Sequence, residues 1–365
     1  MATPEPTAAP APAALPAVMK AVFLNGHGGF EQLEYREDVP VPVPGPGELL
    51  IRVGAAAVNN TDVNTRIGWY SKGVSDGTAA ASAGAEVDDG SWTGATLAFP
   101  RIQGTDACGR VVAVGAGVDP ARIGGRVLVD PVLRPGSGPA GYFASECDGA
   151  FAEFTRVPAE NARVVASDLT DVELASFPCS YSTAENMLTR AEVAAGDTVL
   201  VTGASGGVGS AAVQLARRRG ASVIALAGPA KAALILSLGA RRVLPRDADL
   251  VRELGRGSVD AVIDVVGGQR FPTLLDVLRR DGCYAVAGAI AGPLVELDLR
   301  TLYLKDLRLI GCTIQEPEVF GNLVGYIERA EIRPLVAAIY PLRDIVAAQE
   351  DFLSKRHVGK IVLVP

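Results

Sequence analysis

The stretch Asp197-Thr-Val-Leu-Val-Thr-Gly-Ala-Ser-Gly-Gly-Val-Gly209 decides the fold of this chain. Residues 198–202 are apolar and β-branched, which predicts a buried parallel strand. Residues 210–220 contain helix formers, arginines in the last turn and a terminating glycine, a pattern that predicts a helix. Residues 222–227 predict a second strand. The whole segment is therefore expected to form one βαβ unit.

A glycine-rich turn between a strand and a helix favours anion binding, because backbone N–H groups and the helix dipole point toward the ligand. Here Gly203 permits the tight turn, Gly206 lets the backbone approach a pyrophosphate, and Gly209 lets the helix pack against the strand. We predict a dinucleotide site; the alternative is a tight turn without a ligand. The residues predicted to bind the cofactor are Thr183, Gly203, Ser205, Gly206, Gly207, Val208, Gly209, Lys231, Arg246, Val266, Gly288 and Lys360.

The end of the second strand indicates which dinucleotide is bound. NAD sites usually carry Asp or Glu there to bind the ribose hydroxyls, whereas residues 227–231 read Ala-Gly-Pro-Ala-Lys. No carboxylate repels a 2′-phosphate, and Lys231 and Arg246 are available to bind it. We therefore predict NADPH as the cofactor. The alternative is that Lys231 is a solvated residue at the start of a helix.

Composition limits the class of protein. A chain of 365 residues is long enough for two domains, and its net charge of −7 argues against nucleic acid or an anionic membrane as partner. Residues 1–18 are rich in Ala and Pro and predict a disordered tail rather than a signal peptide. The five cysteines form no CxxC pair, which favours reduced thiols and a cytoplasmic location.

The first half of the chain consists of short β runs separated by prolines and glycines, which predicts a β-rich domain with little helix. Strands are expected at residues 19–24, 47–53, 110–114, 126–129 and 149–154. Residues 71–97 are small, polar and acidic, and predict a long loop. We expect this loop to close over the substrate as a flap.

From residue 170 onward, helical and β patterns alternate, which is typical of a doubly wound parallel sheet in an α/β domain. Helices are expected at 171–177, 182–188, 230–238, 248–254 and 272–278, and strands at 242–244, 261–266 and 283–287. Ligands of such sheets bind beyond the carboxyl ends of the strands, which places residues 265–268 and 288–292 near the cofactor.

The end of the chain predicts a helix at residues 345–352 and a strand at 359–364 that rejoin the first domain. The expected division is a disordered tail at 1–18, a catalytic domain at 19–168 together with 331–365, and a dinucleotide-binding domain at 169–330. The apolar residues 303–310 predict a strand that pairs across a two-fold axis in a homodimer.

Several motifs resemble the medium-chain dehydrogenase/reductase superfamily. These motifs are Gly45-Pro-Gly-Glu-Leu-Leu-Ile-Arg-Val53, Asn59-Asn-Thr-Asp62, Gly104-Thr-Asp-Ala-Cys-Gly-Arg-Val-Val-Ala-Val-Gly115, Gly149-Ala-Phe-Ala-Glu-Phe154, the glycine turn and Gly359-Lys-Ile-Val-Leu363. The resemblance extends from Met19 to Pro365. It implies a β-rich chaperonin-10-like domain joined to a Rossmann doubly wound parallel sheet.

Zinc alcohol dehydrogenases of this superfamily bind a catalytic metal through Cys, His and Cys. The first two of these positions read Asn59 and Thr105 in this chain, and only the third is kept, as Cys179. An amide, a hydroxyl and one thiol do not make a good catalytic zinc site. We therefore predict no metal, and we expect Cys179 to be a small packing residue rather than a ligand or nucleophile.

Loss of zinc points to the quinone oxidoreductase-like branch, whose members read Asn-x-x-Asp at this place and reduce activated double bonds. The resemblance implies Tyr70 and Thr61 as hydrogen-bond donors to the substrate and Asn59 as a residue that positions the substrate or the nicotinamide ribose. The alternatives are an exposed aromatic side chain in a mobile loop for Tyr70 and helix or turn capping for Thr61 and Asn59.

Three functions remain in view. The first is a zinc-independent, NADPH-dependent oxidoreductase that transfers hydride to a quinone, an enone or a related conjugated carbonyl. In such acceptors the negative charge delocalises onto a distant oxygen, so hydrogen-bond donors suffice without a metal. The second is an alcohol dehydrogenase or aldehyde reductase, because Thr61 and Cys179 are retained. The third is a nucleotide-binding protein without catalytic turnover.

Overall fold

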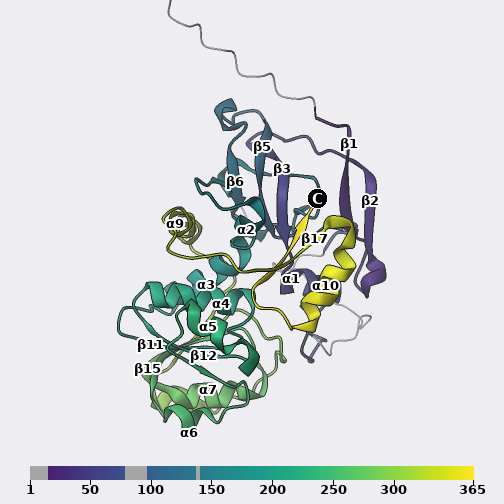
Figure 1. Cartoon of the computed structure of the whole chain (residues 1–365). Helices are drawn as coiled ribbons and strands as arrows, with labels where there is room; N and C mark the ends of the chain where they lie inside the picture. Colours follow the sequence, from purple (N-terminus) through teal and green to yellow (C-terminus); the bar gives the residue numbers. More distant parts are fainter. Residues whose placement is uncertain (1–14, 79–96, 137–139) are drawn as a thin grey trace, which may run out of the picture.

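The computed structural model describes residues 15–78, 97–136 and 140–365. Residues 1–14 of the predicted tail (1–18) lie outside the described residues. The last residue of that predicted tail, Val18, is the first residue of strand β1. Most of the predicted flap, residues 79–96, also lies outside the described residues. The chain forms a β-rich half and an α/β half, which are the upper and lower parts of Figure 1.

The β-rich half is built on one antiparallel sheet, one larger mixed sheet that is antiparallel except for the pair β17–β18, and a small hairpin. Its strands are β1 (Val18–Leu24), β2 (Leu33–Pro40), β3 (Glu48–Ala57), β4 (Arg101–Ile102), β5 (Asp106–Val114), β6 (Arg126–Val129), β7 (Val132–Leu133), β8 (Gly141–Tyr142), β9 (Phe154–Pro158), β10 (Ala162–Val164), β17 (Val336–Pro341) and β18 (Lys360–Val364). Its helices are α1 (Asn60–Arg66), α2 (Asp171–Leu174) and α10 (Ile345–Ser354). The larger sheet has the order β10-β6-β5-β3-β18-β17, and β9 pairs with β3.

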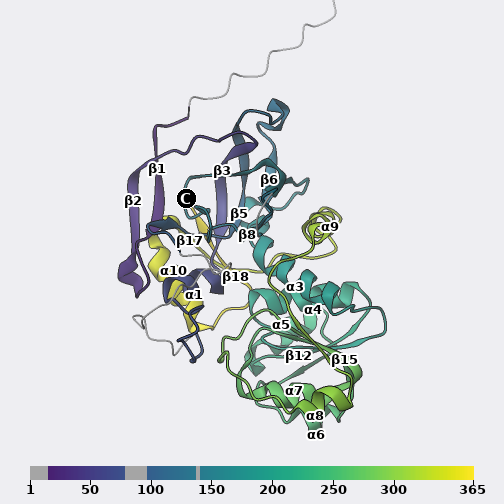
Figure 2. The ribbon, with the colours of Figure 1, turned by 180° about the vertical axis from the view of Figure 1, so that it is seen from behind.

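The end of the chain returns to this first half, as the sequence predicts. β18 pairs antiparallel with β3, with Val362 opposite Ala57, and β17 pairs parallel with β18. Helix α10 lies beside α1 in both ribbon views (Figures 1 and 2), where Arg66 Nε donates to Gln349 Oε1 at 3.0 Å. The start of β18 lies at the boundary with the α/β half, because Gly359 N donates to Ser205 O.

The α/β half contains one six-stranded sheet in the order β13-β12-β11-β14-β15-β16, and all its strand pairs are parallel. Its strands are β11 (Thr198–Val201), β12 (Ser222–Leu226), β13 (Arg242–Leu244), β14 (Val259–Asp264), β15 (Leu278–Val286) and β16 (Arg308–Gly311). Its helices are α3 (Pro178–Arg190), α4 (Gly207–Arg218), α5 (Ala232–Leu238), α6 (Leu250–Leu254), α7 (Phe271–Val277), α8 (Leu299–Leu304) and α9 (Pro317–Glu328). The predicted doubly wound parallel sheet is confirmed.

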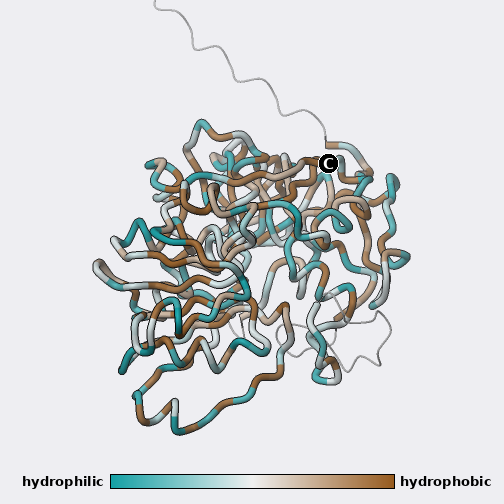
Figure 3. The backbone as a smooth tube through the Cα atoms, turned by 60° about the horizontal axis from the view of Figure 1, so that its bottom comes forward, coloured by the Kyte–Doolittle hydropathy of each residue, from teal (hydrophilic) through white to brown (hydrophobic). Residues whose placement is uncertain are grey.

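Helices cover both faces of this sheet. In Figure 1, α3, α4 and α5 lie above the sheet and α6 and α7 lie below it. Two buried clusters match these layers, since one unites the sheet with α3, α4 and α9 and the other unites it with α6 and α7. In Figure 3 the stacked strands are mostly brown, which marks hydrophobic residues, and many peripheral loops are teal. Burial on both faces explains the short, continuously apolar strands.

Residues 149–154 do not form the predicted strand. The backbone is irregular as far as Glu153, with one isolated bridge between Ala152 and Ala21, and β9 begins at Phe154. The N–H groups of Gly149 and Phe151 donate to the carbonyls of Ile102, in β4, and of Gln103, and Val22 N of β1 donates to Phe151 O, but these bonds do not form a continuous ladder. The segment is apolar because it packs into the core.

Several other boundaries differ from the prediction, and two of these differences bear on the site and on the edge of the sheet. Helix α4 begins at Gly207 and not at residue 210, because Gly206 already has an extended backbone and serves as N-cap. The predicted strand 303–310 is divided, since α8 ends at Leu304 and β16 begins at Arg308. The side chain of Asp298 accepts from Arg300 N at 2.9 Å and starts α8, an N-cap that the apolar pattern concealed.

Candidate active site

The glycine turn has the geometry that its sequence predicts. Gly203 follows β11 with a φ of +56°, in the left-handed region that favours glycine. A Cβ atom on Gly209 would lie 2.2 Å from the carbonyl oxygen of Gly203. Helix α4 therefore packs against the end of the strand with no room for a side chain at position 209.

The N-terminus of α4 is open for an anionic ligand. Gly206 is its N-cap, and no side chain caps the helix at this end. A Cβ on Gly206 would meet only the carbonyl oxygen of Gly203, at 3.5 Å. The space beside Gly206 is thus free of side chains, and the positive end of the helix dipole at this place fits the pyrophosphate of a dinucleotide.

Val266 and Gly288 lie at the same edge of the sheet as the glycine turn. They follow β14 and β15, and the two loops are joined by a hydrogen bond from Ala291 N to Val266 O of 2.9 Å. Asp264 fixes these loops, because its buried carboxylate accepts from Val266 N at 2.8 Å and from Thr202 Oγ1 at 2.5 Å. The sequence analysis missed Asp264, although a carboxylate at the end of a buried strand is a recognisable signal.

A third hydrogen bond of Asp264 comes from Tyr284 Oη, at 2.5 Å. Burial raises the pKa of Tyr284 well above its ordinary value, and the charge of Asp264 adds to this effect. The phenol therefore stays a hydrogen-bond donor. This network holds the carboxyl ends of neighbouring strands in fixed positions below the candidate cofactor site.

Lys231 is more constrained than either interpretation from the sequence assumed. Its Nζ donates to the carbonyl oxygens of Lys355 and His357, both at 2.7 Å. Burial and the charge of Arg246 lower the pKa of Lys231. Burial and the charge of Lys231 in turn lower the pKa of Lys355 to about 8. Lys231 is thus close enough to Arg246 and to Lys355 for repulsion, and the sequence analysis missed Lys355, although the run Lys-Arg-His at 355–357 is a recognisable signal.

Thr183 and Lys360 lie on the side of the glycine turn that faces the β-rich half. Thr183 is on α3 and its Oγ1 donates to Cys179 O at 2.7 Å. A Cβ on Gly207 would lie 3.0 Å from Lys360 Cδ, and the N–H of Gly359 donates to Ser205 O at 3.2 Å. The start of β18 therefore contacts the glycine turn directly.

Lys360, Asp106 and Asn59 form a buried polar triad. Lys360 is 2 % exposed and Asp106 is fully buried, and Lys360 Nζ lies 2.8 Å from Asp106 Oδ2. Lys360 also donates to Asn59 Oδ1, and Asn59 Nδ2 donates to Asp106 Oδ2 at 2.8 Å. The other amide proton of Asn59 is directed to Ala57 O at 3.2 Å. The side chain of Asn59 is therefore engaged in the triad.

Cys179 and Asp62 border this triad. Asp106 Oδ1 accepts from Cys179 N at 2.6 Å, while Cys179 Sγ accepts from Tyr142 Oη at 3.5 Å. Burial raises the pKa of the Cys179 thiol to about 12, and the charge of Asp106 acts in the same direction. Burial raises the pKa of Asp62 to about 7, although its hydrogen bond from Asn59 N and the charge of Lys360 oppose this shift.

Tyr70 and Thr61 are brought together. Tyr70 follows α1 and is half-buried. Burial raises its pKa to about 12, and side-chain hydrogen bonds with Thr61 and Asn64 act in the opposite direction. Asn64 Oδ1 also accepts from Thr78 Oγ1 at 3.1 Å, and Thr78 N donates to Ile290 O at 3.1 Å. A chain of hydrogen bonds thus links Tyr70 to the loop after β15.

The donor set does not fit a catalytic zinc ion. Asn59 is bound to a lysine and an aspartate, Thr105 Oγ1 donates to Phe143 O at 3.4 Å, and Cys179 keeps its proton at neutral pH. A catalytic zinc site needs three N, S or carboxylate ligands around one point. Within the described ranges, no group of three or more His, Cys, Asp or Glu is arranged to hold a metal. That the protein acts without a metal stays a prediction.

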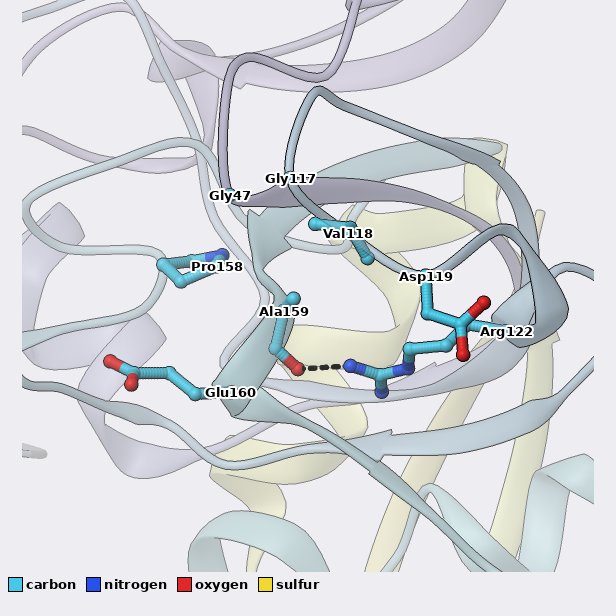
Figure 4. Close-up of a pocket in the computed structure, with 8 residues that line it drawn as sticks. All are labelled: Gly47, Gly117, Val118, Asp119, Arg122, Pro158, Ala159 and Glu160. Carbon is cyan, nitrogen blue, oxygen red and sulfur yellow. Dashed lines mark hydrogen bonds between the residues drawn. The ribbon is translucent and has the colours of Figure 1, made fainter.

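The pocket in Figure 4 lies elsewhere. This shallow depression of about 490 Å³ is in the β-rich half, and it is lined by Gly47, Gly117, Val118, Asp119, Arg122, Pro158, Ala159 and Glu160. Its arginine is bound to backbone, since Arg122 Nη1 donates to Ala159 O at 2.6 Å. None of the site residues predicted from the sequence lines it, so it is not the candidate active site.

Known proteins resemble this chain over nearly its full length. The family described as "Alcohol dehydrogenase GroES-like domain" matches residues 45–167, and the family described as "Zinc-binding dehydrogenase" matches residues 207–329. A solved structure of a candidate alcohol dehydrogenase from Sinorhizobium meliloti 1021 is 51 % identical, with a TM-score of 0.88. The match covers 97 % of this chain and 98 % of that one.

Two curated relatives are more distant. Quinone oxidoreductase of Rattus norvegicus is 29 % identical, and the match covers 95 % of this chain and 98 % of the relative. The chloroplastic NADPH-dependent alkenal/one oxidoreductase of Arabidopsis thaliana is 28 % identical over 97 % of this chain and 82 % of its own.

No helix in the described part of the chain combines the length and the apolar character needed to cross a bilayer.

The two-domain architecture, the uncapped glycine turn and these relatives agree with one another. The chain belongs to the medium-chain dehydrogenase/reductase superfamily, in its quinone oxidoreductase-like branch, and is an oxidoreductase enzyme of a family that binds nicotinamide cofactors.

Proposed function

We propose that the protein is an NADPH-dependent oxidoreductase that transfers hydride to a quinone, an enone or a related conjugated carbonyl without zinc. One observation carries this proposal. Thr61 and Tyr70 share a hydrogen bond near the start of α1, while the lysine–aspartate–asparagine triad includes Asn59 and accepts a hydrogen bond from the backbone of Cys179, two of the three positions that bind zinc in metal-dependent relatives. Hydrogen-bond donors are thus the groups that remain to stabilise the developing negative charge.

The proposed mechanism assigns each residue a simple task. When bound, the reduced nicotinamide supplies a hydride from its C4 to an electron-poor carbon of the acceptor. The residues of the glycine turn hold the pyrophosphate, and Tyr70 with Thr61 donates hydrogen bonds to the oxygen on which charge accumulates. Tyr70 or solvent then returns one proton, so that the double bond gains a hydride and a proton.

NADPH is favoured over NADH by the charges around β12. The charge of Arg246 helps to lower the pKa of Lys231, the charge of Lys231 helps to lower the pKa of Lys355, and a bound 2′-phosphate relieves such repulsion. The Arabidopsis relative is named for its use of NADPH. We propose that Lys355 joins Lys231 and Arg246 in this role, in addition to the residues predicted from the sequence.

The test is a panel of acceptors with purified protein. Quinones, enones and simple aldehydes are compared by loss of NADPH absorbance, with parallel NADH assays and metal analysis. We expect turnover with conjugated acceptors, a preference for NADPH of about 100-fold, roughly 2.7 kcal/mol, and less than stoichiometric zinc. A preference for NADH, or stoichiometric zinc bound at Cys179, would contradict the proposal.

Two other functions are outcomes of the same panel. Turnover of simple alcohols and aldehydes alone would identify an alcohol dehydrogenase or aldehyde reductase, which the retained Thr61 and the Sinorhizobium relative favour. Binding of NADPH without oxidation by any acceptor would identify a non-catalytic nucleotide-binding protein.

We also propose the domain division at residues 168/169 and 330/331. Because all five cysteines are free, we propose a cytoplasmic location.

We further propose a homodimer that forms through the edge strand β16. This strand ends the six-stranded sheet, Leu309 on it is 38 % exposed, and Leu299 and Tyr303 on the preceding helix are 63 % and 61 % exposed. An exposed apolar edge favours pairing with a second copy, and a lysine on such an edge opposes it.

The variant Leu309→Lys is therefore expected to halve the mass measured by light scattering. Ile339→Lys is the matched control, because Ile339 is an exposed residue of β17, an edge strand in the other half. A wild-type monomer, or a Leu309→Lys variant that remains dimeric, would contradict this interface.

A further inference from the structure

The buried triad joins four elements that are distant in sequence. Asn59 starts α1, Asp106 starts β5, Cys179 lies at the start of α3, and Lys360 starts β18. Asp106 is the hub, since its carboxylate accepts from Cys179 N and Asn59 Nδ2 and pairs with Lys360 Nζ. All of its partners are buried.

The arrangement satisfies the physical requirements for a buried ion pair. Two buried charges are tolerated when their geometry is good and further hydrogen bonds satisfy their remaining atoms. Asp106 uses both oxygens, and the ammonium of Lys360 also donates to Asn59. Removing one charge leaves the other buried without a counter-charge, so the position of each member depends on the others.

Lys360 also connects the triad to the nucleotide side of the fold. Its Cδ would lie 3.0 Å from a Cβ on Gly207, at the start of α4, and its neighbour Gly359 donates to Ser205 O. The stem of one side chain thus lies against the glycine turn while its ammonium holds the start of α1. The sequence analysis assigns Lys360 to cofactor binding and Asn59 to positioning the substrate or the nicotinamide ribose.

We propose that Lys360 is a positioning residue, whose ammonium, with Asp106, holds the start of α1 in register with the glycine turn. Through Asp106 the triad links Asn59 to the backbone of Cys179, and these are two of the three positions at which zinc-dependent relatives bind their metal. The poor fit to zinc then has a structural explanation, because a salt bridge takes over the cross-linking.

This inference rests on the proposed function in one respect. Helix α1 carries Thr61, which hydrogen-bonds Tyr70. Loss of the triad displaces these donors from the reacting atoms, and a misplacement of about 1 Å costs on the order of 100-fold in rate. Binding of the nucleotide depends on α4 and is expected to change little.

The experiment compares Lys360→Met, Asp106→Asn and the double variant with wild type by hydrogen–deuterium exchange. The amides of residues 60–66 are expected to exchange about ten-fold faster in each variant, because the cross-link at the start of α1 is lost. We expect kcat to fall about 100-fold while the NADPH Kd stays within about three-fold. Lys305→Met is the control, because Lys305 Nζ donates to Leu275 O and Asp276 O in a different part of the fold.

The double variant keeps the proposal falsifiable if Lys360→Met does not fold. It removes both charges, leaves no unpaired buried ion, and is expected to be no less stable than either single variant. Unchanged exchange in α1, or a raised NADPH Kd with normal kcat, would overturn the proposal and make Lys360 a nucleotide ligand. If wild type shows no turnover, the proposed function fails, while the exchange data still decide the role of Lys360.

Discussion

Replacing Gly209 with alanine is expected to weaken NADPH binding by about 100-fold, roughly 2.7 kcal/mol. The new Cβ would lie 2.2 Å from Gly203 O and 2.6 Å from Gly203 C, and both are backbone atoms that cannot rotate away. Helix α4 must therefore move away from β11, and its first turn is the part that binds the pyrophosphate in the proposed site. Overpacking of this kind typically costs about 1–3 kcal/mol of stability.

The measurement is the NADPH Kd by fluorescence titration, together with the thermal midpoint. Gly321→Ala is the matched control, because Gly321 lies in α9, is exposed, and has nothing within 4 Å of its added Cβ. That substitution is expected to stabilise its helix by about 0.5–1 kcal/mol and to leave binding unchanged. Wild-type affinity in Gly209→Ala would show that the glycine turn does not hold the nucleotide.

The glycine turn could be predicted because its physics is local. A strand, a turn that needs a positive φ at Gly203 and a helix follow one another within a few residues. The glycine that lets helix α4 approach the turn, Gly209, belongs to the same stretch of sequence. The alternating pattern that followed predicted the parallel sheet for the same reason. Even here the helix start was placed at residue 210 instead of Gly207, since Gly207 and Gly209 weaken the helical pattern.

The buried triad could not be predicted in the same way. Positions 59, 106 and 360 are far apart in the sequence, and they meet because β5 and the returning strand β18 both pair with β3. Asn59 and Lys360 therefore received separate roles from separate motifs, and Asp106 received none. A charged residue without a partner nearby in sequence gives no sign of which opposite charge it meets, so the Lys360–Asp106 pair needed the tertiary structure.

The apolar residues 303–310 illustrate another limit. A short apolar run is compatible with a strand or with one side of a helix, and periodicity alone does not separate the two. The capping hydrogen bond at Asp298 starts α8 before the run, so a helix occupies its first residues and the strand its last. Attention to the cap would have divided the segment correctly.

Replacing Tyr70 with phenylalanine is expected to lower kcat by about 100- to 1,000-fold while the NADPH Kd stays within about three-fold. The phenylalanine ring keeps the shape of the side chain and removes only the hydroxyl, which is the proposed proton donor. Burial raises the pKa of Tyr70 to about 12, so the wild-type phenol stays protonated across the usual assay range and this group alone imposes no loss of rate below about pH 11.

Steady-state kinetics in H₂O and D₂O separate this role from a structural one. If Tyr70 donates the proton in the rate-limiting step, the solvent isotope effect of wild type is expected to change in Tyr70→Phe, whereas a packing defect lowers the thermal midpoint instead. Tyr340→Phe is the matched control, because Tyr340 Oη donates to Asp351 Oδ2 of α10 at 3.1 Å and neither residue belongs to the candidate site. Normal kcat in Tyr70→Phe would transfer the role of donor to Thr61 or to solvent, since no other step in the proposed mechanism requires the phenol.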